Sequence, residues 1–166
     1  MPITPLTAEL TLDDKGRVHL PREIARHLQD QGIGMLVAFG KDGPDGGLSF
    51  LPVADFQKLR ARYTAKGPLH PNSRLFNLAI ESLATRVRID GSGRMSIPVA
   101  TRRVFGLDRD LYLFTSGEWF ELWSRPRWEA SLRRAADRWQ AVTGFEAVGA
   151  FEDDLDEVPR EEGDDR

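Results

Sequence analysis

The sequence LTLDDKGRVHLP at positions 10–21 is matched further along the chain by VRIDGSGRMSIP at positions 87–98. A single offset of 77 superposes the three residues that define the motif: Asp13 on Asp90, Gly16 on Gly93 and Arg17 on Arg94. The apolar residues of the two copies alternate in the same frame, and a proline ends each copy. A shared motif in a shared frame indicates an internal repeat rather than a chance similarity.

Each copy predicts a β-hairpin followed by a helix. Apolar and polar residues alternate on both sides of the charged loop, which is the period of a half-buried strand. Three residues separate the acid from the arginine, and the last residue of such a loop commonly adopts a left-handed conformation, which suits Gly16 and Gly93. The acid and the arginine then face each other across the hairpin base. Pro21 and Pro98 are expected at the first helical position.

The repeat continues beyond these helices. Residues 35–40 parallel 111–116, and residues 48–56 parallel 120–128, with about five extra residues in the first copy. These lie in the glycine-rich stretch 40–47, which we expect to be exposed and mobile. Strands and helices therefore alternate in two similar units, and this predicts the α+β class. The apolar spacing predicts three further helices, at about 54–64, 73–84 and 127–142.

The composition excludes several classes of protein. The 166 residues include no cysteine, which rules out a disulfide scaffold, a thiolate metal site and a cysteine nucleophile. No apolar run approaches the roughly 18 residues of a membrane span, so we expect a soluble, cytosolic protein without a membrane partner. The three histidines lack partners at metal-ligand spacing, and no nucleotide-binding or esterase motif is present. The sequence therefore predicts no enzyme, no metal and no cofactor.

The net charge of −3 conceals two charge blocks. Residues 152–166 contain nine acids and two bases, a net charge of −7, whereas residues 1–151 contain 17 acids and 21 bases, a net charge of +4. Within this basic part, residues 58–103 contain ten bases and two acids. We therefore expect a basic folded part that is compatible with nucleic acid, followed by a disordered acidic tail. The tail is predicted to weaken non-specific DNA binding by repelling phosphate.

Three motifs together resemble those of the MraZ family of bacterial transcriptional regulators: LDDKGRVHLP at 12–21, DGSGRMSIP at 90–98 and FELWSRPRWE at 120–129. The resemblance runs from about Ala8 to Ala141, with the motifs in the order and spacing of that family. The chain departs from the family at its start, which reads MPITPLT in place of Met-Phe-x-Gly. The glycine-rich insertion and the acidic tail also exceed the common pattern.

This resemblance implies two tandem SpoVT/AbrB-like domains, built as β-barrel modules of the swapped-hairpin type, in subunits that close into a ring. The expected divisions are a first module at 8–55, connecting helices at 56–83, a second module at 84–127, a C-terminal helix at 128–150, and the acidic tail at 151–166. The implied partners are double-stranded DNA and further copies of the chain.

The resemblance also implies which residues contact DNA. The D-x-x-x-R signature of the family falls on Asp13/Arg17 and Asp90/Arg94, and its basic loop residue falls on Lys15; Gly16 and Gly93 support the turns. The alternative is a purely structural ion pair in each hairpin. The two interpretations are compatible, because an aspartate can hold an arginine in the posture from which it reaches a phosphate or a guanine edge. The second loop has Ser92 where the first has Lys15, so the two modules are expected to contribute unequally.

Two further arginines are candidates for DNA contact. Arg86 and Arg88 flank Val87, so they share one face of a predicted strand, and the alternative is a solvated strand face. Taken together, the sequence predicts a DNA-binding transcriptional regulator of the MraZ type. It would be associated with the nucleoid and would bind short direct repeats upstream of its own gene, in the division and cell-wall cluster. The second hypothesis is an antitoxin-like interaction module whose acidic tail binds a protein partner.

Overall fold

The computed structural model describes residues 6–143, and the chain divides into two compact units, Met1–Glu129 and Ala130–Arg166. The strands are short and all lie in the first unit: β1 (Thr7–Thr11), β2 (Arg17–His19), β3 (Met35–Phe39), β4 (Leu48–Pro52), β5 (Thr85–Arg88), β6 (Arg94–Ser96), β7 (Asp110–Ser116) and β8 (Trp119–Ser124). The helices are α1 (Arg22–Asp30), α2 (Val53–Thr64), α3 (Pro71–Ala79), the 3-10 helix η1 (Glu81–Leu83), α4 (Val99–Val104) and α5 (Arg125–Thr143). The helix α5 begins in the first unit and continues into the second.

The strands of the two repeats are interleaved. Six strands form an antiparallel sheet in the order β1-β7-β8-β4-β3-β5, and β2 pairs with β6 in a separate two-stranded ladder. In the repeat β1 corresponds to β5, β7 to β3 and β8 to β4, so the order of the large sheet reads the same from either end. Each repeat thus supplies its first strand to the edge of the other repeat's half of the sheet.

The predicted hairpins form only at their turns. The amide of Asp13 donates to the carbonyl of Arg17 at 2.9 Å, and the amide of Asp90 donates to the carbonyl of Arg94 at 3.0 Å. Beyond the turns the arms of the first repeat separate, and those of the second keep a single bridge between Ile89 and Met95, because β1 pairs with β7, β5 with β3 and β2 with β6. The expectation of a paired hairpin within each repeat was therefore wrong. A turn is a local structure, whereas the partner of a strand is chosen by the core that the whole chain builds.

The α+β class is confirmed, but the expected barrels are not formed. Within residues 6–143 the large sheet is open, with β1 at one edge and β5 at the other. Each edge strand is the first strand of one repeat and pairs with a strand of the other repeat.

One core lies between the large sheet and the β2–β6 ladder. The ladder contributes Val18 and Met95, both fully buried, and the two central strands contribute Phe50 and Phe120, whose rings stack at a centroid distance of 4.9 Å. Burial of each such side chain is worth about 1.5–3 kcal/mol. The repeats are therefore held together at the centre of the sheet and through the ladder.

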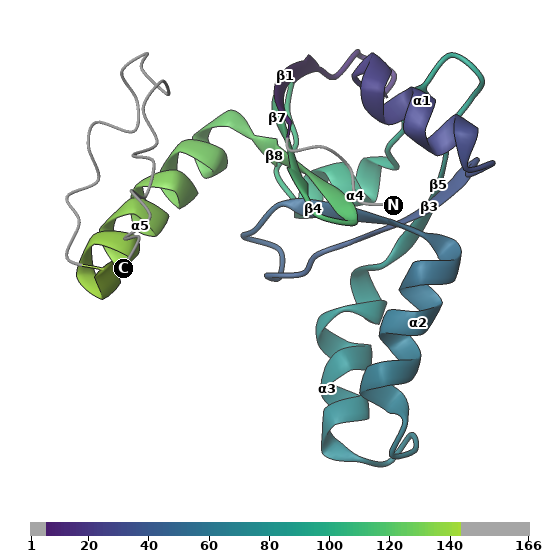
Figure 1. Cartoon of the computed structure of the whole chain (residues 1–166), viewed down its shortest axis with the longest axis vertical. Helices are drawn as coiled ribbons and strands as arrows, with labels where there is room; N and C mark the ends of the chain where they lie inside the picture. Colours follow the sequence, from purple (N-terminus) through teal and green to yellow (C-terminus); the bar gives the residue numbers. More distant parts are fainter. Residues whose placement is uncertain (1–5, 144–166) are drawn as a thin grey trace, which may run out of the picture. The chain divides into compact units, whose positions relative to one another are not determined.

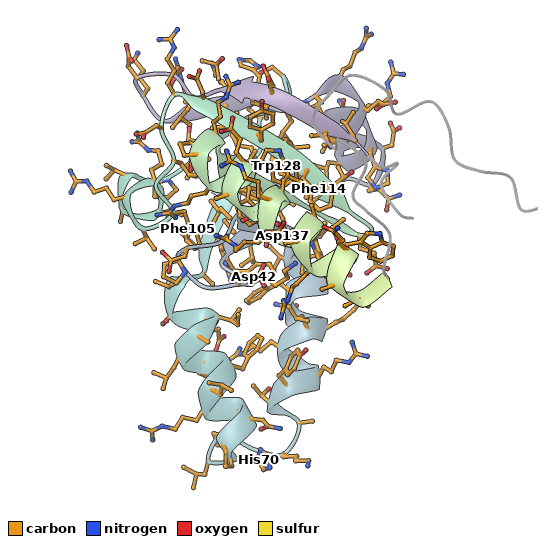
Figure 2. All side chains as sticks on the ribbon, turned by 90° about the vertical axis from the view of Figure 1, so that its left-hand side faces the viewer. Asp42, His70, Phe105, Phe114, Trp128 and Asp137 are labelled. Atoms are coloured by element: carbon orange, nitrogen blue, oxygen red, sulfur yellow. The ribbon has the colours of Figure 1, made fainter. Side chains whose placement is uncertain are left out.

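The opposite face of the sheet carries two aromatic clusters. Under β3 and β4, Phe56 of α2 packs on Phe39, with the rings tilted at 5.2 Å. Under β7 and β8, Trp128 at the start of α5 packs on Phe114 at 5.5 Å, as Figure 2 shows. Phe56 and Trp128 correspond in the repeat. Figure 1 shows α1 on one side of the sheet and the α2–α3 pair on the other.

The helices begin close to the predicted positions. Pro21 and Pro98 were expected to be the first helical residues of α1 and α4. They are instead the N-cap residues, one position earlier. The helix predicted at 73–84 is instead α3 followed by η1, and its cap is His70, whose Nδ1 accepts from the amide of Asn72 at 3.2 Å. His70 lies at the far end of the α2–α3 pair (Figure 2).

The glycine-rich segment 40–47 is packed more closely than expected. Gly40, Gly46 and Gly47 are buried, although the charged residues between them are exposed. A Cβ on Gly40 would meet the ring of Phe105 at 2.7 Å, and one on Gly47 would meet the indole of Trp123 at 2.3 Å. The expectation of a wholly exposed loop was wrong, because these glycines allow the backbone to pass directly under aromatic rings.

Candidate nucleic-acid interface

The β2–β6 ladder brings the arginines of the two repeats onto one surface. Val18 lies opposite Met95 and both point into the core, so the alternate positions of the two strands point outward. Arg17 lies opposite Ser96, and His19 lies opposite Arg94. Arg17 and Arg94 are therefore two positions apart along the ladder. We call this surface, made by Arg17, His19, Arg94 and Ser96, the ladder face.

The first loop, residues 13–17, is organised by one carboxylate at the end of the ladder face. Asp13 Oδ1 accepts from the amides of Lys15 and Arg17, both at 2.9 Å, and Oδ2 accepts from Arg17 Nε at 2.7 Å. Gly16 has a φ of +75°, which a residue with a side chain rarely adopts. The aspartate thereby fixes both the turn and the arginine, while Lys15 stays exposed.

The second loop, residues 90–94, has the same geometry with one additional bond. Asp90 Oδ1 accepts from the amides of Ser92 at 2.9 Å and Arg94 at 3.1 Å, and also from the Ser92 hydroxyl at 2.6 Å. Asp90 Oδ2 accepts from Arg94 Nε at 2.9 Å, and Gly93 has a φ of +77°. The left-handed glycine predicted for each loop is thus confirmed at both positions.

The hydrogen bonds keep both aspartates ionised. The amide of Arg17 contributes most to lowering the pKa of Asp13, and the Ser92 hydroxyl contributes most to lowering the pKa of Asp90, which is shifted further. Each arginine is bound to its aspartate through Nε. Among the described residues, the terminal amino groups of both forks therefore remain for a ligand, in a planar geometry suited to phosphate or to the guanine edge.

The other two predicted arginines lie elsewhere. Arg86 pairs with Val37 and Arg88 with Met35 on the edge of the large sheet, and both arginines are exposed. Val37 belongs to the cluster on the face that carries α2 and α3, which is the opposite face from the ladder. The structure thus brings Arg17 and Arg94 to one surface, with Lys15 exposed in the loop that precedes β2, and places Arg86 and Arg88 on another.

Sequence reasoning missed two features of this surface. His19 is exposed on the ladder face, and it could have been assigned there because it follows Arg17 by two positions on a predicted strand. Arg102 of α4 is not singled out by the sequence, yet its guanidinium covers Gly16 of the first loop. This contact packs the helix of one repeat on the loop of the other, and no local sequence pattern reveals it.

The described part of the chain has neither a metal-binding cluster nor a membrane-spanning helix. Between residues 6 and 143 there is no group of three or more His, Cys, Asp or Glu side chains placed to hold a metal ion. Over the same residues, every helix is too short or too polar to cross a membrane.

Comparison with known proteins gives a consistent result. Residues 82–143 match a family model described as "MraZ protein, putative antitoxin-like". The chain is 33% identical over 135 residues to the transcriptional regulator MraZ of Solidesulfovibrio magneticus, an alignment that covers 79% of this chain and 86% of that relative. It is 32% identical over 121 residues to the regulator of the same name from Nocardia farcinica, covering 73% of this chain and 80% of the relative. It is 30% identical over 139 residues to the transcriptional regulator MraZ of Halorhodospira halophila, an alignment that covers 84% of this chain and 89% of that relative.

Proposed function

The chain belongs to the MraZ family of transcriptional regulators, and from this premise we propose that it binds double-stranded DNA in a sequence-specific manner through the ladder face and its two loops. The observation that carries this proposal is the pairing of β2 with β6, which sets Arg17 and Arg94 two positions apart on one outward surface. Its targets would be short direct repeats upstream of its own gene, in the division and cell-wall cluster. No cofactor takes part.

The geometry of the arginines supports DNA as the ligand. A guanidinium held at Nε by a carboxylate has lost the freedom of its long side chain before any ligand arrives, so less entropy is lost on binding. Its two terminal amino groups can then make paired hydrogen bonds to a phosphate or to guanine O6 and N7. Lys15 at the loop tip adds a charge that follows the phosphate backbone without reading sequence. We assign Arg86 and Arg88 a secondary role, in which they contact DNA that curves around the edge of the sheet.

The interleaved sheet supports the SpoVT/AbrB-like assignment of the fold. In our proposal, residues 8–55 and 84–127 are two copies of one swapped-hairpin-type domain that exchange strands, and residues 56–83 connect them. The short outer strands β2 and β6, each from a different copy, then form one DNA-binding element with approximate two-fold symmetry. The C-terminal helix expected at 128–150 corresponds to α5 as far as Thr143, and residues 144–150 lie outside the described residues.

We further propose that the subunits assemble into a ring. Large apolar side chains are exposed along α2, α3 and the turn between them: Tyr63, Leu69, Leu75 and Leu78. Such a surface marks an interaction site more often than it marks free surface. A ring would present the ladder face repeatedly along one duplex. Modest contacts in each subunit would then add up to tight binding where the direct repeats match the subunit spacing. The protein would act in the cytoplasm, on the nucleoid.

The test is a gel-shift series on the duplex immediately upstream of the chain's own start codon, with a scrambled duplex of equal length. We expect Arg17→Ala to lower the affinity for the upstream duplex by about 10- to 100-fold and to reduce the salt dependence. The matched control is Arg62→Ala, an exposed arginine on α2, which should leave both unchanged. Unchanged binding by Arg17→Ala would exclude the ladder face as the reading surface.

The antitoxin-like alternative has one observation in its favour, the net charge of −7 over residues 152–166, which fall outside the described residues. A chain that ends at residue 151 separates the two functions. If the tail serves a protein partner, its removal abolishes partner binding and leaves DNA binding intact or stronger. If the chain does not discriminate the upstream duplex from the scrambled one, the regulator proposed here is the wrong function.

A further inference from the structure

The two loops rest on different residues of the opposite repeat. Gly16 of the first loop faces Arg102 of α4, and a Cβ at Gly16 would lie 2.7 Å from Arg102 Cζ. Gly93 of the second loop faces Ala25 of α1, and a Cβ there would lie 2.7 Å from the Ala25 methyl group. The repeat offset of 77 makes Ala25 and Arg102 equivalent positions. One site therefore has a guanidinium where the other has a methyl group.

Arg102 connects the first loop to the ladder. Its Nε donates to the carbonyl of Ile97 at 3.1 Å, and the amide of Ile97 donates to the carbonyl of Gly16 at 2.9 Å. The side chain is partly buried, and the guanidinium lies against the Gly16 backbone. A planar group of this kind, fixed by one hydrogen bond and packed over a turn, restricts the motion of that turn.

The second loop has the short side chain of Ala25 in the corresponding place, with an open space beside it. A recess of about 570 Å³ lies beside it, lined in part by Ala25, Gly91, Ser92 and Gly93. The amide of Leu20 donates to the carbonyl of Gly93 at 2.9 Å, so the backbone connection to the ladder is the same in both sites. The second loop thus has only the Ala25 methyl group over its glycine and lacks a guanidinium that would join its turn to the ladder by a side-chain hydrogen bond.

We propose that Arg102 is a positioning residue that makes the two loops functionally unequal: the first loop, held by Arg102, reads the bases, whereas the second loop, which lies beside the recess at Ala25, adapts to the DNA backbone. This inference rests on the DNA-binding function proposed above. The physical reason is that base reading requires donors fixed in place, whereas a backbone contact tolerates small displacements of the loop.

The first test measures the loops without DNA, by amide hydrogen exchange in the full chain. Arg102→Lys keeps the charge but removes the planar group and its Nε. We expect exchange in residues 13–17 to become about fivefold faster, the loss of roughly one hydrogen bond, while residues 90–94 keep their wild-type rates. The reciprocal variant Ala25→Arg should slow exchange in residues 90–94. Equal changes in both loops, or none in the first, would overturn the proposal.

The second test measures selectivity. Arg102→Lys should lower the ratio of affinities for the upstream and scrambled duplexes by about tenfold, while affinity for the scrambled duplex stays within about twofold, since the charge is kept. A variant that merely unfolded would lose both affinities together. If the wild type fails to discriminate the duplexes, the proposed function fails, and the exchange pattern still decides whether Arg102 holds the loop. A normal selectivity ratio in Arg102→Lys would overturn this inference alone.

Discussion

The two loops at the ends of the β2–β6 ladder share their backbone and differ in their surroundings. Each has an aspartate that accepts from two backbone amides and from an arginine Nε, and each has a left-handed glycine. The first loop is exposed at Lys15 and covered by Arg102, whereas the second has Ser92 and packs against Ala25. The two copies thus share the residues that form the turn and differ in residues around it.

A duplicated motif is therefore not necessarily a duplicated site. The residues that are equal in the two copies are those that fix the backbone. The residues that differ lie at the loop tip and against the left-handed glycine, and they determine the charge and the mobility of each loop. Variants that exchange or remove these differing residues therefore test the unequal roles directly.

The largest expected effect concerns stability. Gly93→Ala should destabilise the fold by about 2–4 kcal/mol, because a left-handed alanine costs about 1–2 kcal/mol and its methyl group also meets the Ala25 Cβ, which cannot move without α1. Gly16→Ala should cost somewhat less, about 2–3 kcal/mol, because the Arg102 guanidinium that it meets can turn aside with the loss of its hydrogen bond to the Ile97 carbonyl. Urea unfolding at one protein concentration measures both.

A third glycine supplies the control for this pair. Gly117 has a φ of +64° and no neighbouring atom within 4 Å of a Cβ, so Gly117→Ala reports the left-handed penalty alone. Gly93→Ala should exceed this control most, and Gly16→Ala should lie between the two, because it displaces the hydrogen-bonded Arg102 guanidinium. If Gly16→Ala proves as destabilising as Gly93→Ala, Arg102 is rigid enough to act as part of the core.

An intermediate effect is expected on the salt dependence of DNA binding. Lys15→Ser should lower the affinity a few-fold and reduce the slope of log affinity against log salt by about 0.9 for each bound subunit, the value for one phosphate contact. Ser92→Lys should gain less than this, because the substitution also removes the hydroxyl bond to Asp90 that orders the second loop.

The matched control is Lys66→Ser, which removes an exposed charge near the end of α2. It should leave the slope unchanged. Equal and opposite changes from Lys15→Ser and Ser92→Lys would show instead that the loops contact phosphate equivalently, and the unequal roles would then have to be abandoned.

The sequence predicted the features that depend on residues close together in the chain. The left-handed conformation of Gly16 and Gly93 and the salt bridges of Arg17 and Arg94 depend on five consecutive residues each, so the motif was sufficient to predict them. The ends of α2 were likewise predicted within one residue, because its cap and its apolar face are both contained in the segment.

The sequence did not predict the features that depend on contacts between distant segments of the chain. Alternation placed Arg86 and Arg88 on one face of their strand, but the identity of that face depends on the pairing of β5 with β3. The exchange of β1 and β5 was equally hidden, because the apolar pattern of a strand is satisfied by either partner. Arg102 is a further case, since its contact with Gly16 joins the two repeats.

The smallest expected effect is the order in which the two loops respond to acid. Both aspartates have a pKa below the ordinary value of about 3.9, and Asp90 lies further below it because the Ser92 hydroxyl is an additional donor. A carboxylate whose pKa is lowered on folding stabilises the fold above its unfolded pKa, and that contribution is lost as the pH falls towards the folded value. Below about pH 4, the first loop should therefore lose its Asp13 bonds before the second loop loses those of Asp90.

Carboxyl-carbon NMR of aspartate-labelled protein measures this order, with Asp13→Asn and Asp90→Asn to assign the two signals. Ser92→Ala removes the largest cause of the shift at Asp90, so its titration should move up towards that of Asp13, while Asp13 itself stays where it was. If Asp90 still titrates as in the wild type, the backbone amides hold that carboxylate without help. The serine would then contribute nothing to the difference between the loops, and the contrast would depend on Lys15 and Arg102 alone.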